Sequence, residues 1–274
     1  MNSVTLNNGV TMPQLGYGVW QVENELATKV VLEAIEVGYR SIDTAMIYRN
    51  EKGVGEAIKQ SPVPREELFI TTKVWNSDQG YENTLRAFEE SIERLGLEYV
   101  DLYLVHWPAP KFDKYIDTYK ALEKLYHDGR IKAIGVCNFE IEHLQRLLDE
   151  CEVVPVLNQV ECHPYLTQTE LKSFCAEHNI FVEAWSPLQQ GGEVLQLDVV
   201  QNIAKKHHKS SAQVIIRWHL QNNTIVIPKS VTPSRIQENF DVFDFSLSDE
   251  EMNLLSELNR NERKGSNPKD MHVC

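Results

Sequence analysis

The chain has few cysteines, and neither their number nor their spacing is typical of a disulfide-rich or zinc-binding protein. Five cysteines, an odd number, occur in 274 residues, and no two of them form a CxxC pair. They are Cys137, Cys151, Cys162, Cys175 and Cys274. We therefore expect neither a disulfide framework nor a structural zinc site.

Long hydrophobic runs and positive charge are also scarce. No run approaches about 18 apolar residues, so we expect no membrane span. The N-terminus lacks a basic stretch followed by an apolar one, which predicts that no signal peptide is present. The formal net charge of −13 disfavours nucleic acid as a partner. We expect a reduced, cytoplasmic and monomeric protein that acts on a small molecule.

Two further features are missing, a linker and a dinucleotide-binding glycine motif. No segment rich in Gly, Pro or Ser divides the chain, so residues 1–274 are predicted to form one domain. The glycine pair Gly16 and Gly18 lacks the third glycine of a G-x-G-x-x-G motif. A nucleotide, if one is bound, must therefore be held by another arrangement.

What the sequence does contain is a regular alternation of strand and helix signals. A hairpin is expected over residues 4–12, because Asn8-Gly9 accepts positive φ at low cost. Strands are predicted at 15–19, 41–43, 68–73, 100–106, 131–136, 156–161, 181–185 and 224–227. Helices are predicted at 25–37, 52–59, 81–95, 115–126, 141–148, 170–177, 194–206, 212–220, 235–240 and 249–258. Repeated β-α units in a chain near the typical barrel length predict an α/β fold, a (β/α)8 TIM barrel with an N-terminal β-hairpin.

Four polar residues stand at or just after consecutive predicted strands. Asp43, Lys73 and His106 end three strands, and Tyr48 follows five residues after Asp43. In a (β/α)8 barrel these ends meet at one face, where the chemistry takes place. A lysine beside a tyrosine lowers the phenol pKa from about 10, and a carboxylate keeps the lysine charged.

A histidine beside this group could hold a carbonyl oxygen. The four residues together predict a catalytic site that protonates the oxyanion formed when hydride reaches a carbonyl carbon. Taken singly, each has a structural alternative: Asp43 and Lys73 as a buried ion pair, Tyr48 as packing, and His106 as a satisfied core group. Their occurrence at successive strand ends favours the catalytic interpretation.

Several motifs in order make the chain resemble the aldo-keto reductase superfamily. Gly38 to Ala45, followed by Tyr48, Asn50-Glu51 and Gly53-Val54-Gly55, is similar to the first signature of that family. Residues 101–108 resemble the second conserved region of the family, and the segment 227–239 resembles the third. The motifs at 135–139, 158–161 and 184–188 fall between them. Within the family, the chain most resembles small microbial or protozoan reductases of the glyoxal, diketogluconate or prostaglandin F type.

The resemblance implies reduction of aldehydes and ketones by NADPH, without a metal. Tyr48 would give the proton after hydride leaves C4 of the cofactor, with Asp43 and Lys73 tuning it and His106 orienting the carbonyl. Asn138 and Gln159 would bind the nicotinamide carboxamide. The remaining implied cofactor contacts are Trp185, Ser186, Pro187, Leu188, Lys229, Ser230, Arg235, Glu238 and Asn239. The family usually has serine before the asparagine, where this chain has Cys137.

Residue chemistry alone supports part of this assignment. Lys229 and Arg235 are cations in an acidic chain, and Pro233 could begin a helix whose N-terminus attracts phosphate; without the resemblance both would be taken as surface cations. Trp20, Trp75 and Trp107 follow three strands and, with His106, are expected to line the substrate pocket.

Two other functions stay open. Lys73 at a strand end could form a Schiff base, as in barrel aldolases. The chain could also be a nucleotide-binding regulatory protein that kept the fold, although the four intact site residues count against this. The substrate cannot be named from the sequence.

Overall fold

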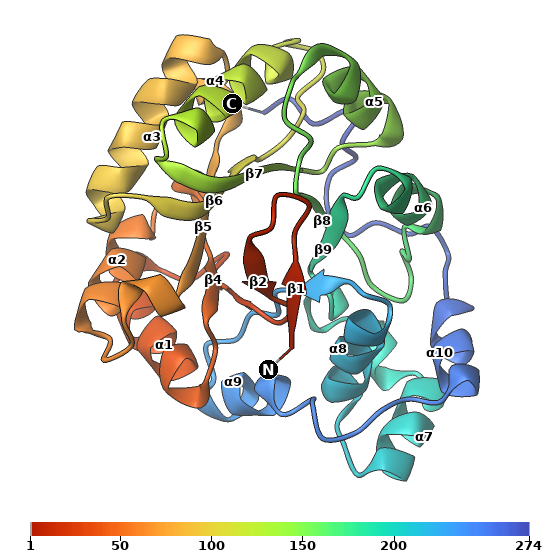
Figure 1. Cartoon of the computed structure of the whole chain (residues 1–274). Helices are drawn as coiled ribbons and strands as arrows, with labels where there is room; N and C mark the ends of the chain where they lie inside the picture. The colour runs from red at the N-terminus through yellow and green to blue at the C-terminus, as the bar shows by residue number, and fades with distance from the viewer. Residues whose placement is uncertain (1, 274) are drawn as a thin grey trace.

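Eight parallel strands form a ring in the order in which they occur along the chain (Figure 1). The computed structural model describes residues 2–273. The sheet begins with β3 (Tyr17–Gly18) and ends with β10 (Ile225–Val226). A parallel bridge between Leu15 and Val226 joins these two edges and closes the ring. The predicted (β/α)8 barrel is confirmed.

Most predicted elements are present, with ends shifted by one or two residues. The other barrel strands are β4 (Ser41–Asp43), β5 (Phe69–Val74), β6 (Val100–Val105), β7 (Ile131–Cys137), β8 (Leu157–Glu161) and β9 (Phe181–Trp185). The helices are α1 (Asn24–Val37), α2 (Glu51–Gln60), α3 (Tyr81–Leu95), α4 (Tyr115–His127), α5 (Ile141–Glu150), α6 (Thr169–Glu177), α7 (Asp198–His207), α8 (Ser211–Gln221), α9 (Pro233–Phe240) and α10 (Asp249–Ser256).

One predicted helix is wrong in extent. Instead of a continuous helix over 194–206, a short 3-10 turn spans Glu193–Gln196 and α7 begins at Asp198. Leu197 between them is extended, with φ −65° and ψ 135°, so the helical hydrogen bonds cannot continue through it. The apolar spacing runs through both pieces, which is why the sequence pattern joined them.

The predicted N-terminal hairpin is confirmed and closes one end of the barrel. Strands β1 (Ser3–Thr5) and β2 (Thr11–Pro13) pair antiparallel, and Gly9 in the turn has φ +86°. Asn7 donates a hydrogen bond of 3.0 Å to the carbonyl of Pro155, just before β8, and Asn8 donates one to the carbonyl of Lys132. The hairpin thus covers the N-terminal end, and any site must lie at the other end.

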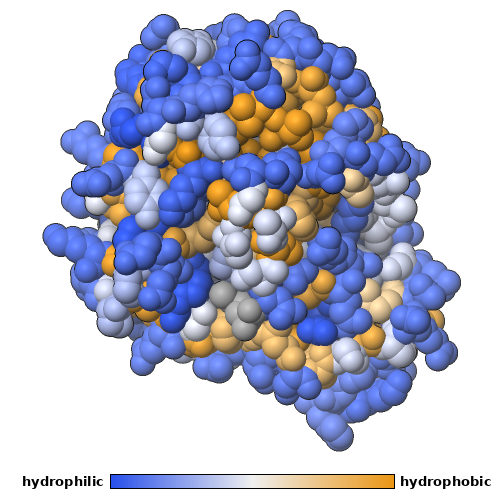
Figure 2. All heavy atoms as spheres, in the orientation of Figure 1, coloured by the Kyte–Doolittle hydropathy of each residue, from blue (hydrophilic) through white to orange (hydrophobic). Residues whose placement is uncertain are grey.

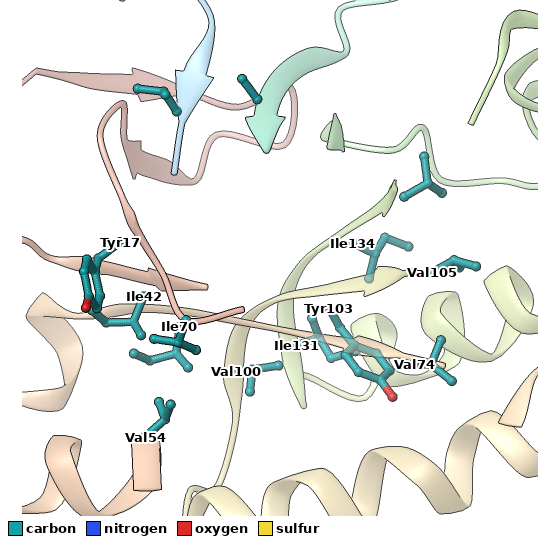
Figure 3. Close-up of a cluster of buried hydrophobic side chains, with 14 of the residues drawn as sticks. Tyr17, Ile42, Val54, Ile70, Val74, Val100, Tyr103, Val105, Ile131 and Ile134 are labelled. Atoms are coloured by element: carbon teal, nitrogen blue, oxygen red, sulfur yellow. The ribbon is translucent and has the colours of Figure 1, made fainter. Parts of the chain in front are cut away.

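The largest apolar cluster lies between the outward faces of the strands and the surrounding helices. Figure 3 shows part of it, with Ile42, Ile70 and Tyr103 among the labelled side chains. A second cluster inside the barrel includes Leu6 and Met12 of the hairpin region. Hydrophilic residues cover most of the outline of the molecule in Figure 2. Between residues 2 and 273, no helix combines the length and apolar character needed to span a membrane.

The glycines at 53 and 55 allow α2 to pack closely between its neighbours. A Cβ atom on Gly53 would lie 2.4 Å from the backbone oxygen of Asn24 at the start of α1. On Gly55 it would lie 2.1 Å from the backbone oxygen of Leu95 at the end of α3. Both distances are far below van der Waals contact. This glycine pair therefore serves helix packing, next to the turn that carries Tyr48.

Candidate active site

Asp43 and Lys73 form a buried ion pair where β4 and β5 end. Lys73 Nζ donates a hydrogen bond of 2.6 Å to Asp43 Oδ1 and one of 2.8 Å to the backbone oxygen of Thr44. Burial pulls the pKa of Lys73 down, but the groups around it, Asp43 first, outweigh burial and the net pKa is raised. Lys73 is therefore a cation at neutral pH.

Tyr48 lies on a 3-10 turn, Met46–Tyr48, which the strand-and-helix pattern did not predict. Asn50 holds this turn in place: its amide nitrogen donates to the carbonyls of Val19 and Val22, each at 2.8 Å. Its carbonyl oxygen accepts from the hydroxyl of Thr44 at 2.7 Å. The amide thus ties the segment after β4 to the segment after β3, and so fixes the position of Tyr48.

Lys73 lies on one side of Tyr48, with its Nζ 5.2 Å from the centre of the phenol ring. The expectation that the pKa of Tyr48 lies below its ordinary value is wrong. Burial raises the pKa of Tyr48, and Lys73 opposes this rise without cancelling it. The phenol is therefore protonated at neutral pH, while the lysine is placed to stabilise the phenolate once a proton has left.

His106 follows β6 and is the neighbour of Tyr48 on the cavity wall. The centroids of their rings are 5.7 Å apart and the rings meet edge to face, and Trp75 also packs edge to face against the imidazole, with centroids 5.1 Å apart. Burial, assisted by Lys73, holds the pKa of His106 well below its usual range, so the ring is neutral. Nδ1 is buried without a hydrogen-bond partner in the described structure. The tautomer that carries its proton on Nε2 can donate a hydrogen bond from that atom.

One cavity of about 1130 Å³ runs along the mouth of the barrel. Every residue predicted for the site lines it except Lys73, which lies behind Tyr48 and Asp43. Trp20, Trp75 and Trp107 form walls near Tyr48, and Trp20 is 43% exposed. The volume exceeds the range of about 300–1,000 Å³ for drug-sized ligands, so it can hold a dinucleotide and a small substrate together.

Two amide side chains lie where a nicotinamide carboxamide is expected. Asn138 has φ +61°; its Nδ2 donates to the backbone oxygen of His106, and its Oδ1 accepts from the indole nitrogen of Trp185 at 2.8 Å. Gln159 Nε2 donates to Asp43 Oδ2 and to Glu183 Oε2. Both hydrogens of Gln159 are thus engaged, and its carbonyl oxygen remains as an acceptor for a ligand.

The other end of the cavity carries positive charge. Lys229 and Arg235 are exposed, and no ion pair within residues 2–273 uses either side chain. Helix α9 begins at Pro233 beside them, as the sequence indicated. Uncompensated cations at a helix N-terminus fit a phosphate group. The cavity therefore has polar groups for a carboxamide at one end and cations for a phosphate at the other, and this arrangement fits NADPH.

Cys137 occupies the position before Asn138 and is fully buried. Burial is the main cause that raises the pKa of its thiol well above the ordinary value. The thiol is therefore protonated, and as a weak donor it contributes less to polar binding here than a hydroxyl would.

Two features of the site were missed by sequence reasoning. The sequence pattern places Glu183 in an ordinary barrel strand, although a carboxyl among apolar strand residues is a usable signal. The C-terminal segment adds Gly265, Ser266 and Met271 to the cavity wall. It is anchored because Glu161 accepts hydrogen bonds from the backbone nitrogens of Lys264 and Gly265. No local sequence pattern marks such a docking.

Comparisons with known proteins agree with this geometry. The model of the Aldo/keto reductase family matches residues 11–260. Glyoxal reductase of Bacillus subtilis (strain 168) is 58% identical over 271 residues, covering 98% of this chain and 97% of that protein. The 9,11-endoperoxide prostaglandin H2 reductase of Trypanosoma cruzi (strain CL Brener) is 57% identical over 270 residues, covering 97% and 95%.

A solved structure gives the same result for the fold. A mutant of the protein Gox0644 in complex with NADPH superposes with a TM-score of 0.95 and 47% identity, and 98% of each chain is covered. The family match and these relatives extend over almost the whole sequence. The chain therefore belongs to the aldo/keto reductase family, and it is a carbonyl-reducing oxidoreductase.

Proposed function

We propose that this protein reduces small aldehydes and α-dicarbonyl compounds, with Tyr48 as the proton donor. It is an NADPH-dependent enzyme that converts the carbonyl group to an alcohol. The observation that carries the assignment of Tyr48 is its place between the buried Lys73–Asp43 pair and the neutral His106, on the wall of one long cavity.

Each of these side chains has a distinct task in the proposed mechanism. When bound, NADPH supplies the hydride for the carbonyl carbon. His106 donates a hydrogen bond from Nε2 to the carbonyl oxygen and so fixes its position. Tyr48 passes its proton to the same oxygen as negative charge develops there. Lys73, held by Asp43, stabilises the phenolate that remains.

The cofactor is held along the cavity by groups at both ends. Gln159 and Asn138 bind the carboxamide, and Trp185 stacks on the nicotinamide ring, where its indole is fixed by the hydrogen bond to Asn138. At the far end, Arg235 grips the 2′-phosphate. The remaining proposed contacts are Ser186, Pro187, Leu188, Lys229, Ser230, Glu238 and Asn239.

The wall beside Tyr48 favours small substrates. Trp20, Trp75 and Trp107, joined by Met271, leave an apolar space around the reacting carbonyl. The glyoxal reductase relative, 58% identical, acts by its name on a small dicarbonyl. We further propose that residues 1–274 act as one domain, that the protein is a cytoplasmic monomer, and that it binds no nucleic acid, in keeping with the net charge of −13.

A substrate panel tests this function. Glyoxal, methylglyoxal, a simple aldehyde, a keto sugar and a bulky prostaglandin-like carbonyl would each be incubated with the protein and either NADPH or NADH. Loss of absorbance of the reduced cofactor is expected with NADPH, and it should be fastest with the dicarbonyls. A preference for the bulky carbonyl would contradict the proposed substrate class, and trapping of an adduct on Lys73 by borohydride would favour an aldolase instead.

A further inference from the structure

Glu183 is a buried carboxyl inside the barrel. It lies on β9 next to Gln159 of β8, and its partner on the other side is Ile225 of β10. Ile225 belongs to the apolar cluster in the barrel interior, and register partners on parallel strands point to the same side. Glu183 is therefore directed inward, just below the layer that lines the mouth.

Glu183 is joined to the catalytic ion pair through Gln159. The amide nitrogen of Gln159 donates a hydrogen bond of 2.7 Å to Glu183 Oε2 and one of 2.8 Å to Asp43 Oδ2. An amide nitrogen has only two hydrogens, so these two carboxyl groups fix the amide in one orientation. In this orientation the carbonyl oxygen of Gln159 is free for a ligand in the cavity.

The charges around Glu183 do not balance if it is ionised. Asp43 from β4, Lys73 from β5 and Cys137 from β7 face it together with Gln159, whereas Ile225 brings no charge. Lys73 is already paired with Asp43. Within residues 2–273, Glu183 Oε1 has no hydrogen-bond partner. Burial, then Asp43, raises the pKa of Glu183 to about 8.

We propose that Glu183 is a positioning residue whose protonation is coupled to the oxidation state of the nicotinamide cofactor. This inference rests on the proposed contact between Gln159 and the nicotinamide carboxamide. In either protonation state, Glu183 Oε2 accepts from Gln159 and keeps the amide oriented. When ionised, Glu183 also places a negative charge behind the amide, which favours the cationic ring of NADP⁺ over the neutral ring of NADPH.

Near pH 8, Glu183 titrates while four neighbouring groups of the site keep their charge. The pKa of His106 is lowered well below its usual value, whereas those of Tyr48, Lys73 and Cys137 are raised. None of these four groups changes charge between about pH 7 and pH 9. The 2′-phosphate is common to both cofactor forms, so its titration cancels in the ratio of their affinities.

Binding measurements at several pH values test the coupling. Dissociation constants of NADPH and NADP⁺ would be measured by protein fluorescence between about pH 6.5 and pH 9.5, at fixed ionic strength. For the unaltered protein, the affinity for NADP⁺ relative to NADPH should rise with pH, on the order of tenfold in all. In Glu183→Gln, which is isosteric but cannot ionise, the ratio should stay flat. A flat ratio in the unaltered protein, or an unchanged rise in Glu183→Gln, would overturn the proposal.

A second variant tests positioning separately from charge. Glu183→Leu removes the acceptor, so NADPH and NADH affinities should both fall by about three- to tenfold, because they share the nicotinamide end. Unchanged affinities in a folded Glu183→Leu protein would overturn the positioning role; if this variant does not fold, the two pH series decide alone. These measurements do not use turnover, so failure to reduce carbonyls would count against the proposed function and not against this inference.

Discussion

Lys73 on β5 donates a 2.6 Å hydrogen bond to Asp43 on β4, and both side chains are almost completely buried. A buried ion pair gives little net stability, because desolvation offsets most of the attraction between the charges. The pair is nonetheless placed beside the phenol of Tyr48, where a fixed cation changes the energy of the phenolate. This position fits the role in proton transfer that we propose for the pair better than a role in folding.

Replacing Lys73 by methionine should damage both activity and stability. Tyr48 loses the cation that opposes the rise of its pKa, and Asp43 is left as an uncompensated buried charge. We expect a loss of turnover as large as that caused by removing the phenol, and a fall of about 3–5 kcal/mol in the free energy of unfolding. Denaturant unfolding and steady-state kinetics check the two effects.

The control for Lys73→Met is Lys29→Met. Lys29 is exposed and lies 3.9 Å from Glu33 on the same helix, an arrangement that contributes little to stability. If Lys73→Met kept the turnover of the unaltered protein, the lysine would have no part in proton transfer.

Arg235→Ala should reduce the preference for NADPH over NADH. The guanidinium is exposed at the charged end of the cavity and can donate two charge-assisted hydrogen bonds to a 2′-phosphate. Such a bond contributes about 1.5–3 kcal/mol, so NADPH affinity should fall by about ten- to a hundredfold while NADH affinity changes little. Titrations of both cofactors measure this, with Arg86→Ala on α3 as the control. Equal weakening of both cofactors would assign Arg235 a structural role.

Asn50→Ala should lower turnover without a large change in cofactor affinity. The amide connects the segments after β3 and β4, and its loss leaves the carbonyls of Val19 and Val22 without their donor. Each unpaired buried group costs about 1–3 kcal/mol, and Tyr48 loses its fixed position. Asn50→Asp keeps an acceptor for Thr44 but loses both donors and brings a buried carboxylate oxygen against two carbonyl oxygens, so it should be at least as damaging as Asn50→Ala. Normal kcat in both variants would show that another contact positions Tyr48.

Buried histidines should make the protein less stable in mild acid. Burial, then Lys172, lowers the pKa of His219 well below its usual value of about 6.5. Below pH 6.5 the unfolded chain binds a proton that the folded chain does not, so the free energy of unfolding falls as the pH falls. The contribution of one such group is about 1.4 kcal/mol per pH unit.

The variant His219→Gln tests this pH dependence. Unfolding midpoints measured between about pH 7.5 and pH 5 should fall less steeply than in the unaltered protein. His127→Gln, which replaces an exposed histidine on α4, is the matched control. An unchanged slope in His219→Gln would mean that His219 is protonated in the folded state as well.

The fold and the location of the site could be predicted because they depend on local patterns. Helix α3 and strands β4 and β9 have the predicted bounds, and Gly96 ends the helix with φ +64°. Asp43, Lys73 and His106 were located by their places at strand ends, which the barrel brings to one face.

The features that could not be predicted depend on contacts between distant parts of the chain. The helix expected over 194–206 breaks at Leu197 although its apolar spacing continues. The net direction of the pKa shift of Tyr48 depends on how deeply the residue is buried, which sequence spacing does not reveal. Gly265 reaches the cavity because its backbone nitrogen binds Glu161, a residue 104 positions away.

Tyr48→Phe tests the central claim most directly, because it removes one hydroxyl group from the cavity wall and leaves the ring. Turnover of a small dicarbonyl and the dissociation constant of NADPH would be measured on the same preparation of the variant and of the unaltered protein. We predict that turnover falls by roughly 10²–10⁴-fold, the usual contribution of general acid catalysis, and that NADPH binding stays nearly unchanged. Turnover close to that of the unaltered protein would contradict the assignment of Tyr48 as the proton donor.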